Sequence, residues 1–141
     1  MADKKDVSFI YALQHNVTKK IYIGKTKSLY KRYMFHLTEL KQKKHRSKGL
    51  QEAFDQYGAD FSVYILEEVE DPRERIDYYG SLVAKERVAE VKWMDIYDTL
   101  ENGYNEQDSA SKKLLMKPQN TFPLKEGKPE LPKNRKETEW H

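Results

Sequence analysis

The 141-residue chain is long enough for one domain with a hydrophobic core and a further segment. Its hydrophobic fraction, 38%, is low and its charged fraction, 35%, is high, which predicts a small core under a heavily solvated surface. Cysteine is absent, so disulfides and thiolate zinc sites are excluded. No apolar run is long enough to span a membrane, and the N-terminus has no signal-peptide pattern. We therefore expect a cytoplasmic protein.

Positive charge is concentrated in one part of the chain. The formal net charge is only +3, yet the stretch from 25 to 48 holds one acid, Glu39, among many bases. The stretch from 51 to 106 is rich in Asp and Glu instead. This asymmetry favours a surface that faces a polyanion, although a charged surface can also serve solubility alone. The bases are Lys25, Lys27, Lys31, Arg32, Lys41, Lys43, Lys44, Arg46 and Lys48.

Two strands are predicted near the N-terminus. Residues 7–13 alternate β-favouring side chains between two faces, and residues 20–25 are again β-branched and aromatic. The connector between them is short and polar, so the two strands should pair antiparallel. Gly24 lies near the end of the second strand, where the missing side chain would let another backbone or a phosphate approach.

A helix is predicted directly after the second strand, with Ser28 or Thr26 as its N-cap. Its buried face has apolar residues at helical spacing, namely Leu29, Tyr33, Leu37 and Leu40. Arg32 and His36 are four residues apart, so they share a neighbouring face. A basic loop with His45 follows over residues 41–48.

The remaining elements complete a small α+β domain. We expect a short helix over 49–57 ended by Gly58, a third strand over 61–69, and a helical region over 72–100 interrupted near Gly80. Asp71 and Pro72 are typical of a helix start. The predicted boundaries are a flexible N-terminus (1–6), a folded domain (7–106) and a polar tail (107–141). The tail has too few apolar residues to fold alone, so we expect an extended arm.

Cleavage of a phosphodiester bond needs groups of the kinds found here. Arg32 can hold a phosphate by two parallel hydrogen bonds, and His36, with an ordinary pKa near 6.5, can shuttle a proton at neutral pH. A tyrosine can serve as a base only where neighbouring positive charge favours the phenolate, and Lys25 and Arg32 are candidates for that charge. Each of these residues alone can equally well be structural.

The tripeptides Phe9-Ile10-Tyr11 and Tyr22-Ile23-Gly24, together with the residues that follow them, resemble the GIY-YIG nuclease family. The resemblance covers residues 8–105 and departs at Phe9, where the family most often has glycine. It implies a three-stranded antiparallel sheet flanked by helices. It also implies catalytic roles for six residues, Tyr11, Tyr22, Arg32, His36, Glu90 and Asn105.

The resemblance implies a DNA endonuclease that uses Mg²⁺ or Mn²⁺ held by Glu90, with Glu86 as the competing carboxylate one helical turn earlier. The pattern is most similar to the homing-endonuclease branch, in which a histidine like His45 occurs. The expected partner is double-stranded DNA, a homodimer is compatible, and no membrane is involved. Restriction and repair nucleases, or a binding protein that cuts nothing, are the alternatives. The expected DNA-binding residues are Lys25, Lys27, Lys31, Lys43, Lys44, His45, Arg46 and Lys48.

Overall fold

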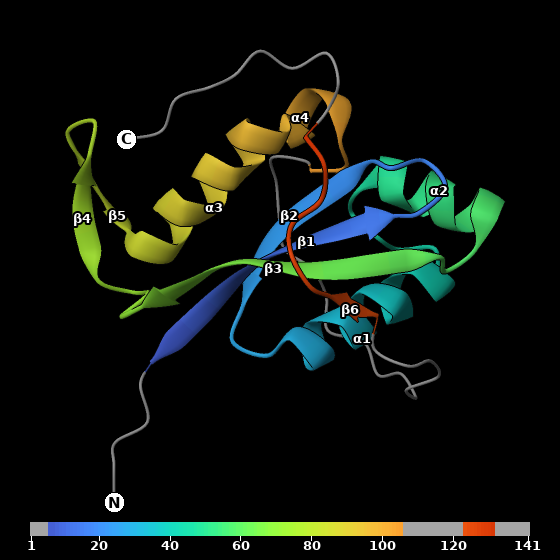
Figure 1. Ribbon diagram of the computed structural model, residues 1–141, viewed down its shortest axis with the longest axis horizontal. Coiled ribbons are helices and arrows are strands. Elements are labelled where there is room, and N and C mark those ends of the chain that lie inside the picture. Colours follow the sequence, from blue (N-terminus) through green and yellow to red (C-terminus); the bar gives the residue numbers. More distant parts are fainter. Residues whose placement is uncertain (1–5, 106–122, 132–141) are drawn as a thin grey trace, which may run out of the picture.

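A four-stranded sheet with strand order β2-β1-β3-β6 organises the computed structural model, which describes residues 6–105 and 123–131 (Figure 1). Strands β1 (Val7–His15), β2 (Ile21–Thr26) and β3 (Phe61–Glu70) pair antiparallel, as predicted. The helices are α1 (Leu29–Lys41), α2 (Lys48–Tyr57), α3 (Lys85–Tyr97) and α4 (Thr99–Asn102). The mixed α/β class and helices flanking a sheet are confirmed.

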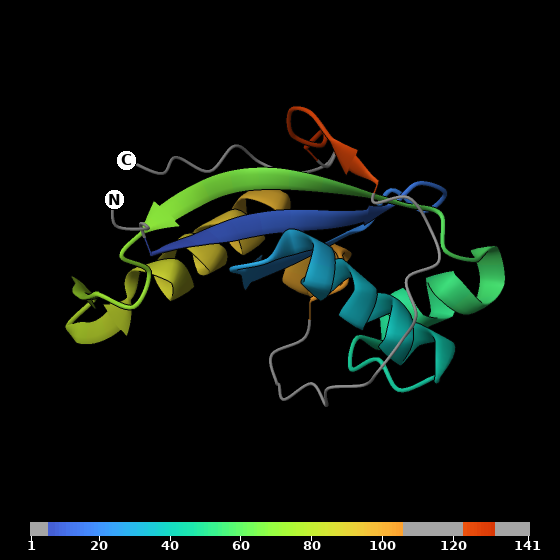
Figure 2. The same ribbon diagram turned by 90° about the horizontal axis from the view of Figure 1, so that it is seen from below.

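The sheet has a helix layer on each face, because the side chains of β1 alternate between two cores (Figures 1 and 2). Tyr11 and Leu13 pack with α1 and α2 on one face. Ile10 and Ala12 pack with α3 on the other face. Strand β2 is an edge strand of this sheet, so the two helix layers can approach one another beyond it.

Helices α1 and α2 form where the sequence predicts them. The Ser28 hydroxyl accepts a hydrogen bond from the Lys31 amide and caps α1. Gly58 ends α2 with a positive φ of 83°, which glycine adopts at little cost. None of the helices in the described parts of the chain is long and apolar enough to cross a membrane.

The prediction of a helical region over 72–100 is wrong for the residues before Lys85. Strands β4 (Arg75–Tyr78) and β5 (Ser81–Ala84) form a separate antiparallel hairpin there, and α3 begins only at Lys85 (Figure 1). The turn residues Tyr79 and Gly80 both have positive φ, 51° and 87°. A two-residue loop of this kind matches the right-handed twist of paired strands, whereas a helix cannot continue through it.

The prediction of a three-stranded sheet is also incomplete. Strand β6 (Leu124–Lys125) pairs parallel with β3 and becomes the fourth strand. The Val63 amide donates to the Pro123 carbonyl, and the Tyr97 hydroxyl donates to the Pro129 carbonyl at 2.8 Å. Residues 123–131 of the expected arm therefore lie on the domain. Residues 106–122 and 132–141 lie outside the described residues.

Candidate active site

Tyr11 and Tyr22 are brought together by the register of β1 and β2. Tyr11 lies opposite Gly24, and Leu13 lies opposite Tyr22, so the two phenols are diagonal neighbours on the face that α1 covers. Their ring centroids are 6.5 Å apart. The space beside Gly24 is filled by the Tyr11 ring, because a Cβ there would lie 2.5 Å from Tyr11 Cζ. Gly24 thus makes room for a phenol of its own chain, not for a phosphate or a second backbone.

Arg32 on α1 lies beside both phenols, close enough for its charge to act on each of them. Burial raises the pKa of Tyr11 and Tyr22, and the Arg32 charge lowers it in part. Burial lowers the pKa of Arg32 itself, but the two phenols outweigh this effect and raise it, so the guanidinium stays charged. The site therefore holds two neutral phenols next to a permanent positive charge.

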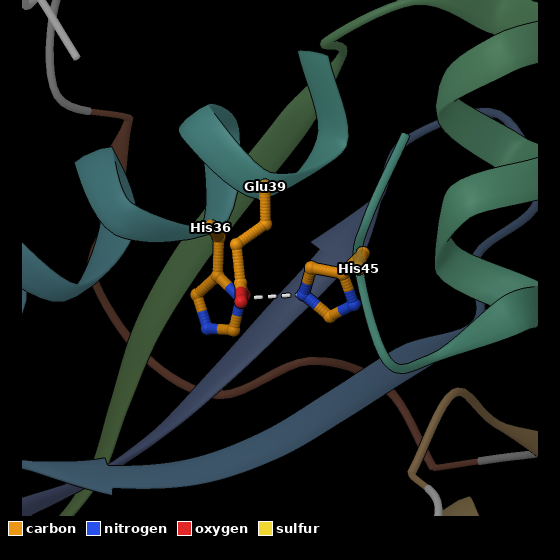
Figure 3. Close-up of side chains that lie close together, drawn as sticks. All are labelled: His36, Glu39 and His45. Carbon is orange, nitrogen blue, oxygen red and sulfur yellow. Dashed lines mark hydrogen bonds between the residues drawn. The ribbon is translucent and has the colours of Figure 1, made fainter. Parts of the chain in front are cut away.

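His36 connects the phenols to a second imidazole. Its Nε2 lies 2.7 Å from the Tyr11 hydroxyl, and its Nδ1 lies 2.8 Å from His45 Nε2 (Figure 3). Both rings are buried. Burial, followed by the charge of Arg32, lowers the pKa of His36 and brings that of His45 to about 4. Both histidines are therefore neutral at pH 7.

Glu90 on α3 lines an open cavity of about 790 Å³ together with Tyr22 and Lys25. Its Oε1 is 2.8 Å from Arg87 Nη1 and 3.9 Å from Lys25 Nζ. The carboxylate is close enough to raise the pKa of both phenols further. Glu86, the alternative metal ligand, instead accepts a hydrogen bond from the Ser8 hydroxyl at 2.8 Å.

Asn105 attaches the segment after α4 to the exposed edge of β2. Its Oδ1 accepts from the Ile23 amide at 2.7 Å, and its Nδ2 donates to the Ile23 carbonyl at 2.8 Å. The neighbouring Tyr104 amide donates to the Ile21 carbonyl. An asparagine side chain thus continues the hydrogen bonding of the sheet, and Asn105 lines the cavity next to Glu90 and Tyr22.

A second group of potential metal ligands lies behind the phenols. One ligand atom each from His36, Glu39 and His45 falls within 4.8 Å of the others, and all three residues are buried (Figure 3). Burial raises the pKa of the Glu39 carboxyl, and the charges of Arg32 and Arg46 lower it in part. Glu39 was not among the site residues predicted from the sequence, because a single acid in a basic stretch is usually a surface residue.

The residues predicted to bind DNA do not all face solvent. The lysines among them lie at or near the surface, and Lys27 and Lys43 pair with Asp6 and Asp55. Arg46 lines the cavity with Glu90. His45 is only 7% exposed and hydrogen-bonded to His36, so it lies behind the phenols. The sequence reasoning missed Arg87, whose spacing of three residues from Glu90 on one helix is the signal that could have found it.

Comparison with known proteins gives a consistent result. A family model described as the GIY-YIG catalytic domain matches residues 7–107. Over 131 residues the chain is 32% identical to Intron-associated endonuclease 1 of Enterobacteria phage T4, covering 93% of this chain and 46% of that protein. The chain therefore spans less than half the length of this relative.

Two solved structures are similar to the fold described above. Both show the catalytic domain of I-TevI, named in one as an intron endonuclease, in mutant form, and in the other as a homing endonuclease. The first has a TM-score of 0.57 and 28% identity, and covers 74% of this chain and 98% of its own. The second has a TM-score of 0.56 and 29% identity, and covers 72% and 99%.

Proposed function

This chain belongs to the GIY-YIG catalytic domain family, and from this premise we propose that it is a divalent-metal-dependent endonuclease that hydrolyses phosphodiester bonds in double-stranded DNA. The observation that carries the proposal is that the Arg32 guanidinium lies beside the phenols of Tyr11 and Tyr22, and that Tyr22 lines a cavity together with Glu90. Charge stabilisation, a proton acceptor and a hard-cation ligand are the three parts that hydrolysis of a phosphodiester requires.

Arg32 binds the scissile phosphate and stabilises the charge that grows on its oxygens during attack by water. The guanidinium is suited to this role because it stays charged while half-buried beside the phenols. Tyr11, aided by Tyr22, orients the attacking water and takes its proton, after the phenol has released its own proton to solvent. Since burial raises the pKa of both phenols, this step depends on positive charge beside them.

Glu90 is the residue that would hold Mg²⁺ or Mn²⁺, which bind oxygen ligands. Its carboxylate fits such an ion, because it is a buried oxygen donor that lines an open cavity. The ion would take the place of the positive charges of Arg87 and Lys25 beside this carboxylate. A bound divalent cation supplies positive charge next to the phosphate and the phenols. Asn105 keeps β2 in place beside this carboxylate by its two hydrogen bonds to Ile23.

The DNA backbone would lie across the basic side of α1 and the loop that follows it. Lys31 and Lys44 are exposed there, and so is Lys48 at the start of α2. Lysines that neutralise phosphates make affinity fall steeply as salt rises. Cutting both strands requires two such sites or two turnovers at one site. We therefore include a homodimer on DNA in the proposal, to be tested by sedimentation with and without a duplex.

Nicking of supercoiled plasmid in Mg²⁺, in Mn²⁺ and with chelator tests the proposal. Arg32→Ala and Glu90→Ala should each lose cleavage, while their circular dichroism spectra match the wild type. Glu86→Ala is the matched control, because it removes a carboxylate one turn earlier on α3 that bonds Ser8 instead of lining the cavity with Glu90. Cleavage at the wild-type rate by Glu90→Ala, or without any divalent cation, would contradict the assignment.

We propose that the biological role is of the homing or mobile-element type. The similarity to a phage intron-associated endonuclease supports this choice over restriction or repair. Sequencing the ends of cleaved DNA tests it, because a homing enzyme should cut at one long preferred sequence. A non-cleaving DNA-binding protein is the second candidate, and it predicts salt-dependent binding that never leads to nicks.

A further inference from the structure

The chain of hydrogen bonds behind Tyr11 has one direction, and a backbone amide sets it. The Ser47 amide donates to His45 Nδ1 at 3.0 Å. A backbone N–H can only donate, so His45 Nδ1 carries a lone pair and the ring hydrogen of this neutral imidazole is on Nε2. The orientation of every bond farther along follows from this one.

The hydrogen on His45 Nε2 is donated to His36 Nδ1, 2.8 Å away. His36 Nδ1 is then an acceptor, so the hydrogen of the neutral His36 ring is on Nε2 and is donated to the Tyr11 oxygen at 2.7 Å. Both imidazoles are at most 7% exposed, so water does not compete for these positions. His36 therefore has no lone pair facing Tyr11.

We propose that His45 is a positioning residue that keeps His36 as a hydrogen-bond donor to Tyr11, and that His36 stabilises the Tyr11 phenolate instead of taking its proton. This inference rests on the proposed hydrolysis, in which Tyr11 receives a proton from water. The phenol hydrogen of Tyr11 therefore goes to solvent water and not to His36, before Tyr11 accepts the proton of the attacking water; Arg32 cannot take it, because a guanidinium has no acceptor. His45 thereby has a role other than the DNA contact that its place in a basic loop suggests.

The same geometry argues against a metal ion bound by His36, Glu39 and His45, although their ligand atoms are close enough. If His45 Nε2 bound a metal, the ring hydrogen would move to Nδ1, where it would face the hydrogen of the Ser47 amide. His15 supports the donor assignment, because its Nδ1 also accepts from a backbone amide, that of Val17, and its Nε2 lies 3.1 Å from the Gly58 carbonyl.

Nitrogen-15 NMR of the imidazole rings tests this directly at pH 7, without reference to nuclease activity. The expected spectra show His36 and His45 each protonated at Nε2 and bare at Nδ1. A His36 protonated at Nδ1, or an exchanging mixture of both tautomers, would overturn the proposal. If the tautomers are as expected but the protein cuts no DNA, the hydrogen-bond direction stands and the proposed function fails.

Two variants separate the hydrogen bond from the packing of the ring. His45→Phe keeps an aromatic ring but has no donor, so the fixed tautomer of His36 should be lost and kcat should fall roughly tenfold to hundredfold, with KM little changed. His45→Gln keeps an N–H donor, so it should keep much of the fixed His36 tautomer and much of kcat. His15→Phe removes a different buried imidazole and should leave the His36 signals as they are. Equal losses in His45→Phe and His45→Gln would refute a donor role.

Zinc alone, added to the wild-type protein, tests the competing metal site. We expect no rise in melting temperature and no shift of the His36 or His45 signals. Stoichiometric stabilisation by zinc that disappears in Glu39→Gln would show that the three residues form a metal site, and would overturn the proposed role of His45.

Discussion

Gly24→Ala tests whether the Tyr11 ring is the reason for glycine in the second tripeptide. A Cβ at residue 24 would stand 2.5 Å from Tyr11 Cζ, 2.8 Å from Cε1 and closest to the phenol oxygen. The ring cannot move away freely, because its hydroxyl is bonded to His36 and its other side is buried. Overpacking of this kind costs about 1–3 kcal/mol of the free energy of unfolding.

The same substitution in a Tyr11→Leu background should cost much less. Leucine lacks Cζ, Cε1 and the hydroxyl, so the clash is gone, and alanine in a strand is intrinsically better than glycine by about 0.5–1 kcal/mol. The coupling energy of the double-mutant cycle should therefore be about 1–3 kcal/mol. Urea unfolding at pH 7, followed by tryptophan fluorescence, measures all four proteins.

Gly58→Ala is the control for this cycle. Gly58 has a φ of 83° and a ψ of −168°, a region used almost only by glycine, and no atom lies within 4 Å of an added Cβ, so alanine there costs about 1–3 kcal/mol of backbone strain. That cost should be the same with Tyr11 or Leu at position 11. If Gly24→Ala likewise costs the same in both backgrounds, the close approach of Tyr11 is not what requires glycine.

Three further predictions concern stability. Asn105→Ala removes two hydrogen bonds to Ile23 and should lower the free energy of unfolding by about 1–3 kcal/mol, measured by urea unfolding; Asn102→Ala, at an exposed site, should change it little. The pKa of His45 is about 4 in the folded protein against 6.5 ordinarily, and that of His36 is also lowered, so the unfolded chain binds more protons below pH 6.5. Stability should be complete above pH 6.5 and fall towards pH 4, by at most about 1.4 kcal/mol per pH unit for each histidine, and His45→Phe should flatten this slope in urea titrations at several pH values. Tyr97→Phe removes the bond to the Pro129 carbonyl and should speed hydrogen exchange of the Val63 amide, which is bonded to Pro123 in the same segment.

The strands and helices of the first sixty residues are predictable because their signals are local. Alternation along β1 and β2, a serine cap before α1 and a glycine after α2 each need only a few neighbouring residues. The spacing of Arg32 and His36 places both on one side of α1 for the same reason. What the sequence does not contain is the diagonal pairing of Tyr11 with Tyr22, since that depends on the register of the two strands.

The sequence predicts a helix where β4 and β5 form, because a helical spacing of apolar residues overlaps there with two β-favouring runs. Val88, Val91 and Met94 have helical spacing, and extending that pattern backwards includes Val83. Of these residues only Met94 lies in the core beside α3, where Ala89 and Tyr97 pack instead of the valines. The residues RIDY and SLVA on either side of Tyr79-Gly80 are the contrary signal, since a two-residue turn with glycine between β-favouring runs predicts a hairpin. Strand β6 has no such signal, because Leu124 and Lys125 are too short a run to show a β pattern. They form a strand only because they pair with β3.

His45 could not be placed from the sequence. It lies in a run of bases whose other members are mostly exposed, and its partner His36 is on a different element. Only the return of the loop after α1, fixed by the Ser47 hydroxyl bonding the Tyr104 carbonyl, puts the imidazole behind the phenols. The charge of a segment indicates whether most of its residues face solvent. It does not indicate which single residue of the segment is buried, because that depends on tertiary contacts.

The position of the site follows from β2 being the edge strand. The Arg32 and His36 side chains belong to the helix layer on one face of the sheet, and Glu90 belongs to the layer on the other face. A central strand would keep these two layers apart, whereas at the edge Tyr22 lines one cavity together with Glu90. Arg32 does not line that cavity, but it lies beside Tyr22. An edge left open would also expose the backbone of β2 to pairing with another chain. Asn105 resolves this conflict, because a side-chain amide satisfies Ile23 without adding a strand that would close the cavity.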